Sequence, residues 1–344
     1  MVEVKRVDGS PRARGQSLHG LNKTALPGRE VLNQSMLSYY LYRLAGFIVP
    51  LIPPRLGYWL SSRLGDILFR LLKEARSAVR DNVIHILGRE TDKAAIDRTV
   101  REVFRNSAKN YFDLFRVPAL SAGQIRKMVR IHGWENVDRA LAAGKGLIVV
   151  SAHFGNVDVV AQVLAHPYKV TVVAEHLKPE ALFHYICDLR GSKGIKLIPI
   201  DGPLLGLFRA LRRNEIVGLA ADLDITGSGV VVDFFGEPVQ LPSGHVRLAL
   251  HTGAKMVMGF SLRLSDNTFA LHIEPPLELE ATGDFQRDVR VNTEQVVAVL
   301  ERYIGQHPEQ WVMFRPIWRM ADSKQPMADN WGDQINEDRP RLAL

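Results

Sequence analysis

The pattern of apolar and polar residues changes once along the chain, near residue 133. Before that point apolar residues recur at helical spacing among many cations, and after it short β-branched runs alternate with helical segments. The apolar stretch 36–49 is interrupted by Arg43 and is too short to cross a bilayer, which takes roughly 20 residues. Together with the leucine-rich stretch 56–71, it predicts either two amphipathic helices at a membrane interface or two helices packed on the core.

The second half of the chain predicts an α/β domain. Strands are expected at 147–152, 170–174, 196–200, 216–221, 230–235, 255–262 and 269–274. Helices are expected near 157–165, 179–190, 203–213, 243–251 and 286–305. Strand–helix units followed by closely spaced strands predict a mostly parallel central sheet flanked by helices, with an antiparallel part added late.

Four segments follow from these patterns. They are a disordered basic tail (1–30), an amphipathic helical membrane-associating subdomain (31–130), an α/β core (131–325) and a C-terminal tail (326–344). The net charge of +7 favours an anionic partner such as a lipid surface, a phosphorylated substrate or nucleic acid. The single cysteine and the absence of an apolar leader predict a cytoplasmic protein.

The stretch LIVVSAHFGNVD at 147–158 is the first candidate for chemistry. Its apolar run predicts a buried strand that ends just before His153, at the edge of the sheet where ligands bind in α/β proteins. Asp158 falls in the first turn of the next helix, from which its carboxylate could hold one imidazole nitrogen and leave the other basic. The alternative is a histidine with a structural role only.

A second buried strand ends in acids, at Asp222 and Asp224. These carboxylates are expected to face the same crevice as His153. The pattern Asp222-x-Asp224-x-Thr226 also has the form of the nucleophile motif of magnesium-dependent haloacid-dehalogenase-type phosphatases. Against that alternative, no later pair of aspartates follows a strand to complete a magnesium site.

Other candidate residues lie in turns and loops. Arg190, close to Lys193 and Lys196, suits phosphate recognition, and the alternative is a solvated basic turn without a ligand. The turn Phe235-Gly236-Glu237 lets the backbone approach a ligand, and Arg315 could lie at the crevice or at a membrane interface. We find no metal-ligand spacing and no glycine-rich nucleotide motif.

Taken together, HFGNVD at 153–158, the Asp222/Asp224 strand end, the FFGEP turn at 234–238 and RLALHTGAKMV at 247–257 resemble the lysophospholipid-acyltransferase superfamily. The chain is most similar to its lipid A biosynthesis lauroyl/myristoyl acyltransferase family and the phosphatidylinositol mannoside acyltransferase branch. The likeness runs over roughly residues 36–320. It implies a glycerol-3-phosphate acyltransferase-like fold.

The resemblance also implies roles for residues. His153 would be the general base and Asp158 its orienting partner, as in the His-x4-acid dyad of that family. The substrate-binding residues would be Asn156, Arg190, Asp222, Asp224, Phe235, Gly236, Glu237 and Arg315. Val157 stands where the lipid A branch has tryptophan, and Asp158 agrees better with the mannoside branch.

The function expected from the resemblance is acyl transfer. The donor would be acyl-CoA or acyl-carrier protein, and the acceptor a hydroxyl of a membrane glycolipid or phospholipid, with no metal and no other cofactor. We expect a peripheral monomer on the cytoplasmic face of the cell membrane, without a nucleic-acid partner. The alternatives are the phosphatase above and a non-catalytic protein that binds anionic lipid.

Overall fold

The computed structural model describes residues 29–202 and 204–318. Its helices are α1 (Arg29–Ile48), α2 (Pro54–Leu71), α3 (Lys73–Leu87), α4 (Lys93–Arg116), α5 (Ala122–Met128), α6 (Trp134–Leu141), α7 (Val157–Ala165), α8 (Glu180–Gly191), α9 (Leu205–Arg212), α10 (Gly244–Thr252) and α11 (Phe285–Gln306). Short 3-10 turns are η1 (Val49–Leu51), η2 (Val117–Ala119) and η3 (Pro308–Gln310). The predicted C-terminal tail and nearly all of the predicted basic tail lie outside the described residues.

The strands form one large sheet and one hairpin. They are β1 (Val129–His132), β2 (Leu147–Ser151), β3 (Val170–Ala174), β4 (Lys196–Pro199), β5 (Ile216–Ala220), β6 (Val230–Phe234), β7 (Glu237–Leu241), β8 (Lys255–Arg263) and β9 (Phe269–Ile273). The sheet has the order β1-β9-β8-β2-β5-β3-β4, and β6 and β7 form the separate hairpin. Only β8 and β9 are antiparallel within the large sheet, which confirms the predicted mostly parallel sheet with a late antiparallel part.

Helices cover both faces of this sheet, because alternate side chains of its strands point in opposite directions. Ile148 and Val150 of β2 pack with side chains of α9, α10 and α11. Leu147 packs on the other face with side chains of α5, α6 and α7. Burial on both faces explains why β2 is an unbroken apolar run.

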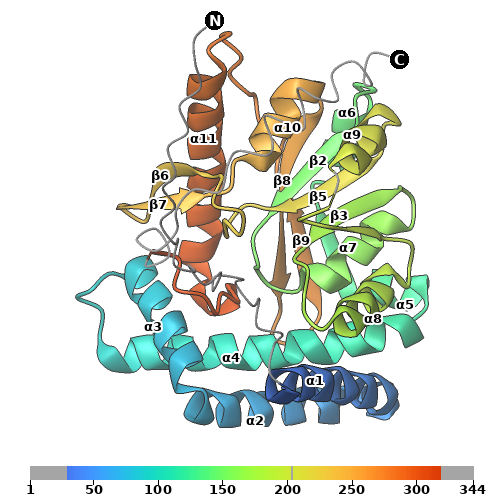
Figure 1. The fold of residues 1–344 in the computed structure, drawn as a ribbon, viewed down its shortest axis with the longest axis vertical. Coiled ribbons are helices and arrows are strands. Elements are labelled where there is room, and N and C mark those ends of the chain that lie inside the picture. The colour runs from blue at the N-terminus through green and yellow to red at the C-terminus, as the bar shows by residue number, and fades with distance from the viewer. Residues whose placement is uncertain (1–28, 203, 319–344) are drawn as a thin grey trace, which may run out of the picture.

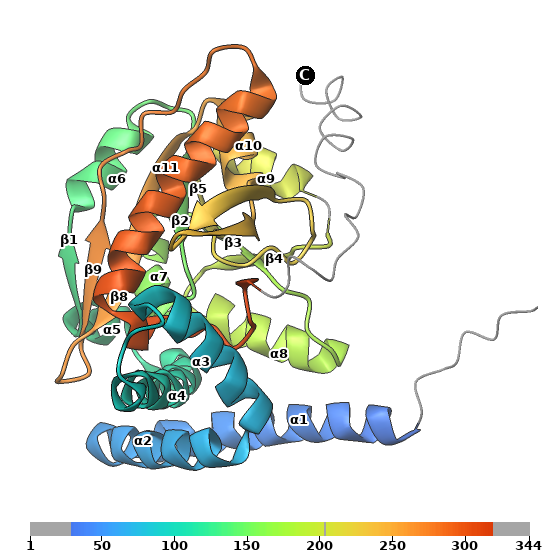
Figure 2. The same cartoon turned by 90° about the vertical axis from the view of Figure 1, so that its left-hand side faces the viewer.

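The helical part of the chain forms a separate layer. Helices α1 and α2 are outermost, and α4 lies between them and the α/β core (Figures 1 and 2). Large apolar side chains of α1 and α2 remain exposed on this layer, among them Phe47 (73%), Trp59 (54%) and Leu64 (49%). No described helix has the length and apolar character that crossing a membrane requires. The proposed boundaries between segments stay predictions.

Among the strands and α-helices, β1, β7 and α6 were not expected from the sequence. Strand β1 has only four residues, and its exposed positions interrupt the apolar pattern. Strand β7 contains Pro238, which disfavours a strand in a sequence-based reading but is tolerated at the edge of a two-stranded hairpin.

Close contact between α2 and α4 depends on glycines in α2. A β-carbon added at Gly65 would lie 2.6 Å from the backbone of Arg105, and one added at Gly57 would lie 1.9 Å from the ring of Phe112. These positions therefore need the smallest residue, although glycine is a poor helix former.

We predict opposite effects for two glycine-to-alanine variants. Gly65→Ala should lower the free energy of unfolding by about 1–3 kcal/mol because the methyl group meets backbone atoms. Gly123→Ala in α5 is the matched control, since the nearest atom to its added β-carbon is 4.0 Å away. That variant should be stabilised by about 0.5–1 kcal/mol. Urea unfolding measures both, and equal effects would contradict the packing argument.

Candidate active site

Neighbouring strands β2 and β5 bring His153 and Asp222 together. The two strands pair in parallel with Ser151 opposite Ala220, so their carboxyl ends meet at the same edge of the sheet. His153 Nδ1 lies 2.9 Å from Asp222 Oδ1, and the backbone N–H of His153 donates to Asp222 Oδ2 at 2.8 Å. The carboxylate therefore holds both the ring and the main chain of His153.

A third donor to this carboxylate comes from Trp311. Its indole N–H donates to Asp222 Oδ2 at 2.8 Å. The segment that carries Trp311 pairs with the chain around His153, because Val312 N donates to the carbonyl of His153 and Gly155 N donates to that of Gln310, each at 2.8 Å. Asp222 is fully buried, and these three hydrogen bonds offset the cost of burying its charge.

The hydrogen bond to Asp222 decides which nitrogen of His153 is basic. A carboxylate only accepts hydrogen bonds, so Nδ1 carries the proton and Nε2 is left with a lone pair. The side chain remains 46% exposed. The charge of Asp222 is the main cause that raises the pKa of His153 above its usual value. A base of this kind can accept a proton from a bound hydroxyl group.

The turn after His153 requires glycine. Gly155 has φ +60°, and a β-carbon added there would lie 1.5 Å from the carbonyl oxygen of Ser261. Asn156 then caps α7, since its Oδ1 accepts from the N–H of Val159 at 3.2 Å. Asn156 is buried, and its side chain has this structural contact rather than an open position in the crevice.

Asp158 does not make the contact with His153 that we expected. Its carboxylate instead pairs with Arg190, whose Nε lies 2.7 Å from Asp158 Oδ1, and Asp222 takes the place on the imidazole. The reason is geometric: β5 is the immediate neighbour of β2, whereas the first turn of α7 directs Asp158 toward the end of α8. Both members of the pair still act on His153, Asp158 raising its pKa and Arg190 lowering it. A role for either in substrate binding or catalysis stays a prediction.

Two other predicted residues, Asp224 and Arg315, have their contacts at strand ends without joining His153. Asp224 accepts hydrogen bonds from the N–H groups of Thr226, Gly227 and Gly229, so it holds the turn after β5. Arg315 pairs with Glu175, which directly follows β3. Since β3 is the neighbour of β5, this ion pair lies at the same edge of the sheet as Asp222.

The turn Phe235-Gly236-Glu237 lies in the β6–β7 hairpin and not at the carboxyl ends of the parallel strands. Phe235 and Gly236 both have positive φ, as a two-residue hairpin turn requires. Glu237 pairs with Arg89 beyond the end of α3. Aromatic rings next to Trp311 include those of Phe234, at 6.1 Å between centroids, and Trp318, at 6.3 Å.

The contacts of Asp222 and Asp224 disfavour the magnesium-dependent phosphatase. Asp222 is fully buried between His153 and Trp311, and Asp224 is bound by backbone N–H groups. Within residues 29–202 and 204–318, no cluster of three or more histidine, cysteine or acidic side chains is arranged to hold a metal ion.

Sequence reasoning missed Trp311 as part of this site. It lies 89 residues after Asp222, and no local motif relates the two positions. In the sequence Trp311 lies close to Arg315, for which we expected a position at the crevice or at a membrane interface. This proximity did not predict a contact with Asp222.

A model of the bacterial lipid A biosynthesis acyltransferases matches residues 29–320. The chain belongs to this family. It is 32% identical to a phosphatidylinositol mannoside acyltransferase of Mycobacterium tuberculosis (strain CDC 1551 / Oshkosh) over 71% of this chain and 77% of that protein. The corresponding enzyme of Mycolicibacterium smegmatis is 29% identical over 70% of this chain and 78% of its own length.

A lipid A biosynthesis palmitoleoyltransferase of Escherichia coli (strain K12) is 24% identical over 74% of this chain and 82% of its own. The resemblance inferred from the sequence motifs is therefore confirmed, and the protein is a glycolipid acyltransferase. This family membership also disfavours a protein that only binds lipid.

The geometry predicts how the imidazole titrates. Asp222→Asn should lower the pKa of His153, because the negative charge that stabilises the imidazolium is removed. Asp158→Asn is the matched control, since Asp158 contributes less to the raised pKa. NMR titration of histidine-labelled protein measures both, and a larger decrease in Asp158→Asn would contradict the assignment of Asp222.

Proposed function

We propose that the protein transfers a fatty acyl group from an acyl thioester to a hydroxyl of a membrane glycolipid, with His153 as general base and Asp222 as the residue that orients it. The observation that carries this proposal is the Nδ1 contact with a buried carboxylate, which leaves Nε2 basic at the exposed end of a strand. This assigns to Asp222 the orienting role that the resemblance gave to Asp158.

In the proposed reaction His153 Nε2 removes the proton of the acceptor hydroxyl as its oxygen attacks the thioester carbonyl carbon. The tetrahedral intermediate collapses, the carbon–sulfur bond breaks, and the imidazolium returns the proton to the thiolate. We propose that backbone N–H groups at the start of α7, which begins four residues after His153, stabilise the oxyanion, and one such donor is worth about 2.7–4 kcal/mol. Because only neutral imidazole accepts a proton, the rate should increase as pH rises through the raised pKa of His153.

The names of the relatives support a mannoside-bearing acceptor. The two mycobacterial relatives act on phosphatidylinositol mannosides by name, and their identity to this chain is higher than that of the lipid A enzyme. The donor would be acyl-CoA or acyl-carrier protein. The Asp158–Arg190 ion pair, which lies within electrostatic reach of His153, is our candidate for a contact to polar groups of either substrate.

The exposed apolar layer supports peripheral attachment to a membrane. We propose the cytoplasmic face as the side that it binds. The helices that expose these side chains also carry cations, Arg43 on α1 and Arg55, Arg63 and Arg70 on α2, and this combination is typical of helices that lie in the interface. The exposed large apolar side chains of the two helices are Leu37, Tyr40, Leu41, Leu44, Phe47, Ile48, Leu56, Trp59, Leu60, Leu64, Ile67 and Leu71. A lipid acceptor could then reach the protein without leaving the bilayer.

His153→Gln should abolish acyl transfer while the protein keeps its fold, because positioned general-base catalysis contributes roughly 10²–10⁴-fold. The assay uses labelled acyl-CoA or acyl-carrier protein with phosphatidylinositol mannosides, and the product is identified by mass. His184→Gln, which removes an exposed histidine of α8, is the control and should retain the rate. Turnover near that of the wild type in His153→Gln would exclude the proposed mechanism.

Leu60→Glu should weaken binding to phosphatidylglycerol vesicles by about tenfold or more, because an exposed apolar side chain of α2 becomes charged. Val231→Glu is the control, since Val231 is 59% exposed but lies on the β6–β7 hairpin. Vesicle co-sedimentation measures both variants. An equal loss in the two would show that general charge, and not the α1–α2 layer, governs attachment.

A further inference from the structure

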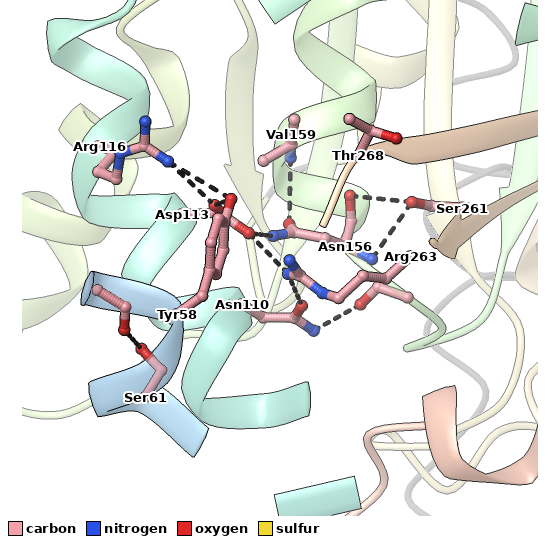
Figure 3. Close-up of polar contacts among 12 residues, drawn as sticks. Tyr58, Ser61, Asn110, Asp113, Arg116, Asn156, Val159, Ser261, Arg263 and Thr268 are labelled. Carbon is pink, nitrogen blue, oxygen red and sulfur yellow. Dashed lines mark hydrogen bonds and ion pairs between the residues drawn. The ribbon is translucent and has the colours of Figure 1, made fainter. Parts of the chain in front are cut away.

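A buried polar network joins α2 and α4 to the strand end of β8 and the start of α7 (Figure 3). Asp113 is at its centre. Its carboxylate accepts hydrogen bonds from Tyr58 at 2.6 Å and Asn156 at 3.1 Å, and it pairs with Arg263 at 2.6 Å. Arg116 is close to the same carboxylate, at 3.7 Å.

This network contains more positive than negative charge. One carboxylate, that of Asp113, faces both Arg263 and Arg116. Arg263 is buried, and its Nε and Nη1 have no hydrogen-bond partner among the described residues. Burying charge without full compensation is costly, so an anion close by would stabilise the arrangement.

Lys109 adds a third cation at the edge of the network. It is half-buried and has no ion pair with any residue in the described ranges, and its pKa is lowered by burial and by Arg263. The carboxylates that act on it are already engaged, Glu102 with Arg105 and Asp113 with Arg263. Its ammonium group has three donors, and none of them is hydrogen-bonded to a residue within 29–202 or 204–318.

Lys109 lines a pocket of about 350 Å³ that is separate from the residues around His153. The lining includes Arg55, Tyr58, Trp59, Lys109, Asp266 and Asn267. Arg55 also has no ion pair in the part of the chain that the structure describes. The carboxylate of Asp266 is bonded to the N–H and hydroxyl of Thr268, at 2.9 and 2.6 Å.

The pocket opens beside the exposed apolar face of α2. Trp59 belongs to both, since it lines the pocket and is 54% exposed. A lipid whose chains lie against this face would place its headgroup at the depth of Arg55 and Lys109. Cations and an aromatic ring together are typical of sites at the polar edge of a membrane.

We propose that this pocket binds the phosphate group of an anionic membrane phospholipid, held between Lys109 and Arg55. The bound phospholipid would anchor the enzyme to the membrane and would be distinct from the acyl donor and acceptor. This inference rests on the proposed attachment of α1 and α2 to the membrane. The phosphate would offset the surplus charge of the network. Since Tyr58 lines the pocket and bonds to Asp113, which in turn holds Asn156, the bound headgroup would lie two hydrogen bonds from the cap of α7.

The test compares Lys109→Gln with Arg70→Gln. Arg70 is an exposed residue of α2 in the same helical layer, but it does not line the pocket. Arg70→Gln therefore removes the same charge as Lys109→Gln without changing the pocket. A charge near the surface is worth about 1 kcal/mol, or about fivefold in binding. Lys109→Gln should lose about tenfold or more of the affinity for vesicles of 30% phosphatidylglycerol in phosphatidylcholine, and Arg70→Gln about fivefold or less. Equal losses would overturn the site.

Asp266→Asn gives a change of opposite sign. Asp266 is the one carboxylate in the lining, so its removal should tighten binding of an anionic headgroup to the pocket and raise the affinity for the same vesicles. If the pocket bound a cation instead, the same variant would weaken binding. Weaker or unchanged binding would count against the proposal. Thermal unfolding of each variant checks that the fold is kept.

A soluble arm separates this site from membrane attachment as a whole. Proteins labelled with ¹³C-methyl groups on lysine are titrated at low salt with three ligands: inorganic phosphate, glycerol 3-phosphate and the phosphatidylglycerol vesicles. A response of the Lys109 signal, identified by its absence in Lys109→Gln, supports the pocket even if vesicle binding fails. If free phosphate competes with vesicles for the protein, the phosphate group alone is sufficient for binding to the pocket. If the Lys109 signal responds only to the vesicles, the ligand is the headgroup of a membrane lipid. No response of Lys109 to any of the three ligands would overturn the proposal.

Discussion

The buried carboxylate of Asp222 is the constraint on which the candidate active site depends. It is fully buried, so it must be compensated, and it is compensated by the ring and main chain of His153 and by the indole of Trp311. Losing one partner of a buried charge costs about 3–5 kcal/mol. The hydrogen bonds from His153 that stabilise the buried charge of Asp222 therefore also fix the orientation of the imidazole and leave its Nε2 basic.

The surrounding elements can be understood as supports for this arrangement. Parallel pairing of β2 with β5 sets the separation of the two side chains, and the turn at Gly155 lets α7 begin directly against Ser261. Asn156 then connects the start of α7 to Asp113 in α4. The layer with the exposed apolar face and the layer with the histidine are thus joined through hydrogen bonds in the interior.

Much of the α/β core could be predicted, because buried parallel strands such as β2 and β5 are continuous apolar runs between turn residues. The sequence also located His153 at a strand end. It could not show which acid holds the ring, since Asp158 is near in sequence whereas Asp222 is near only after two strands pair. The roles of Trp311 and Asp113 could not be predicted for the same reason, because their hydrogen-bond partners come from elements far away in the sequence.

The pairing of the segment around Trp311 with the residues after β2 bears on the order in which the molecule is made. Every strand of the sheet precedes Trp311 in the sequence, so during synthesis β2 and β5 can pair before the indole has emerged. Until then Asp222 lacks one of its donors and the chain around His153 lacks its neighbour. A nascent or truncated chain can therefore contain the whole sheet while Asp222 and the chain around His153 still lack their contacts with the Trp311 segment.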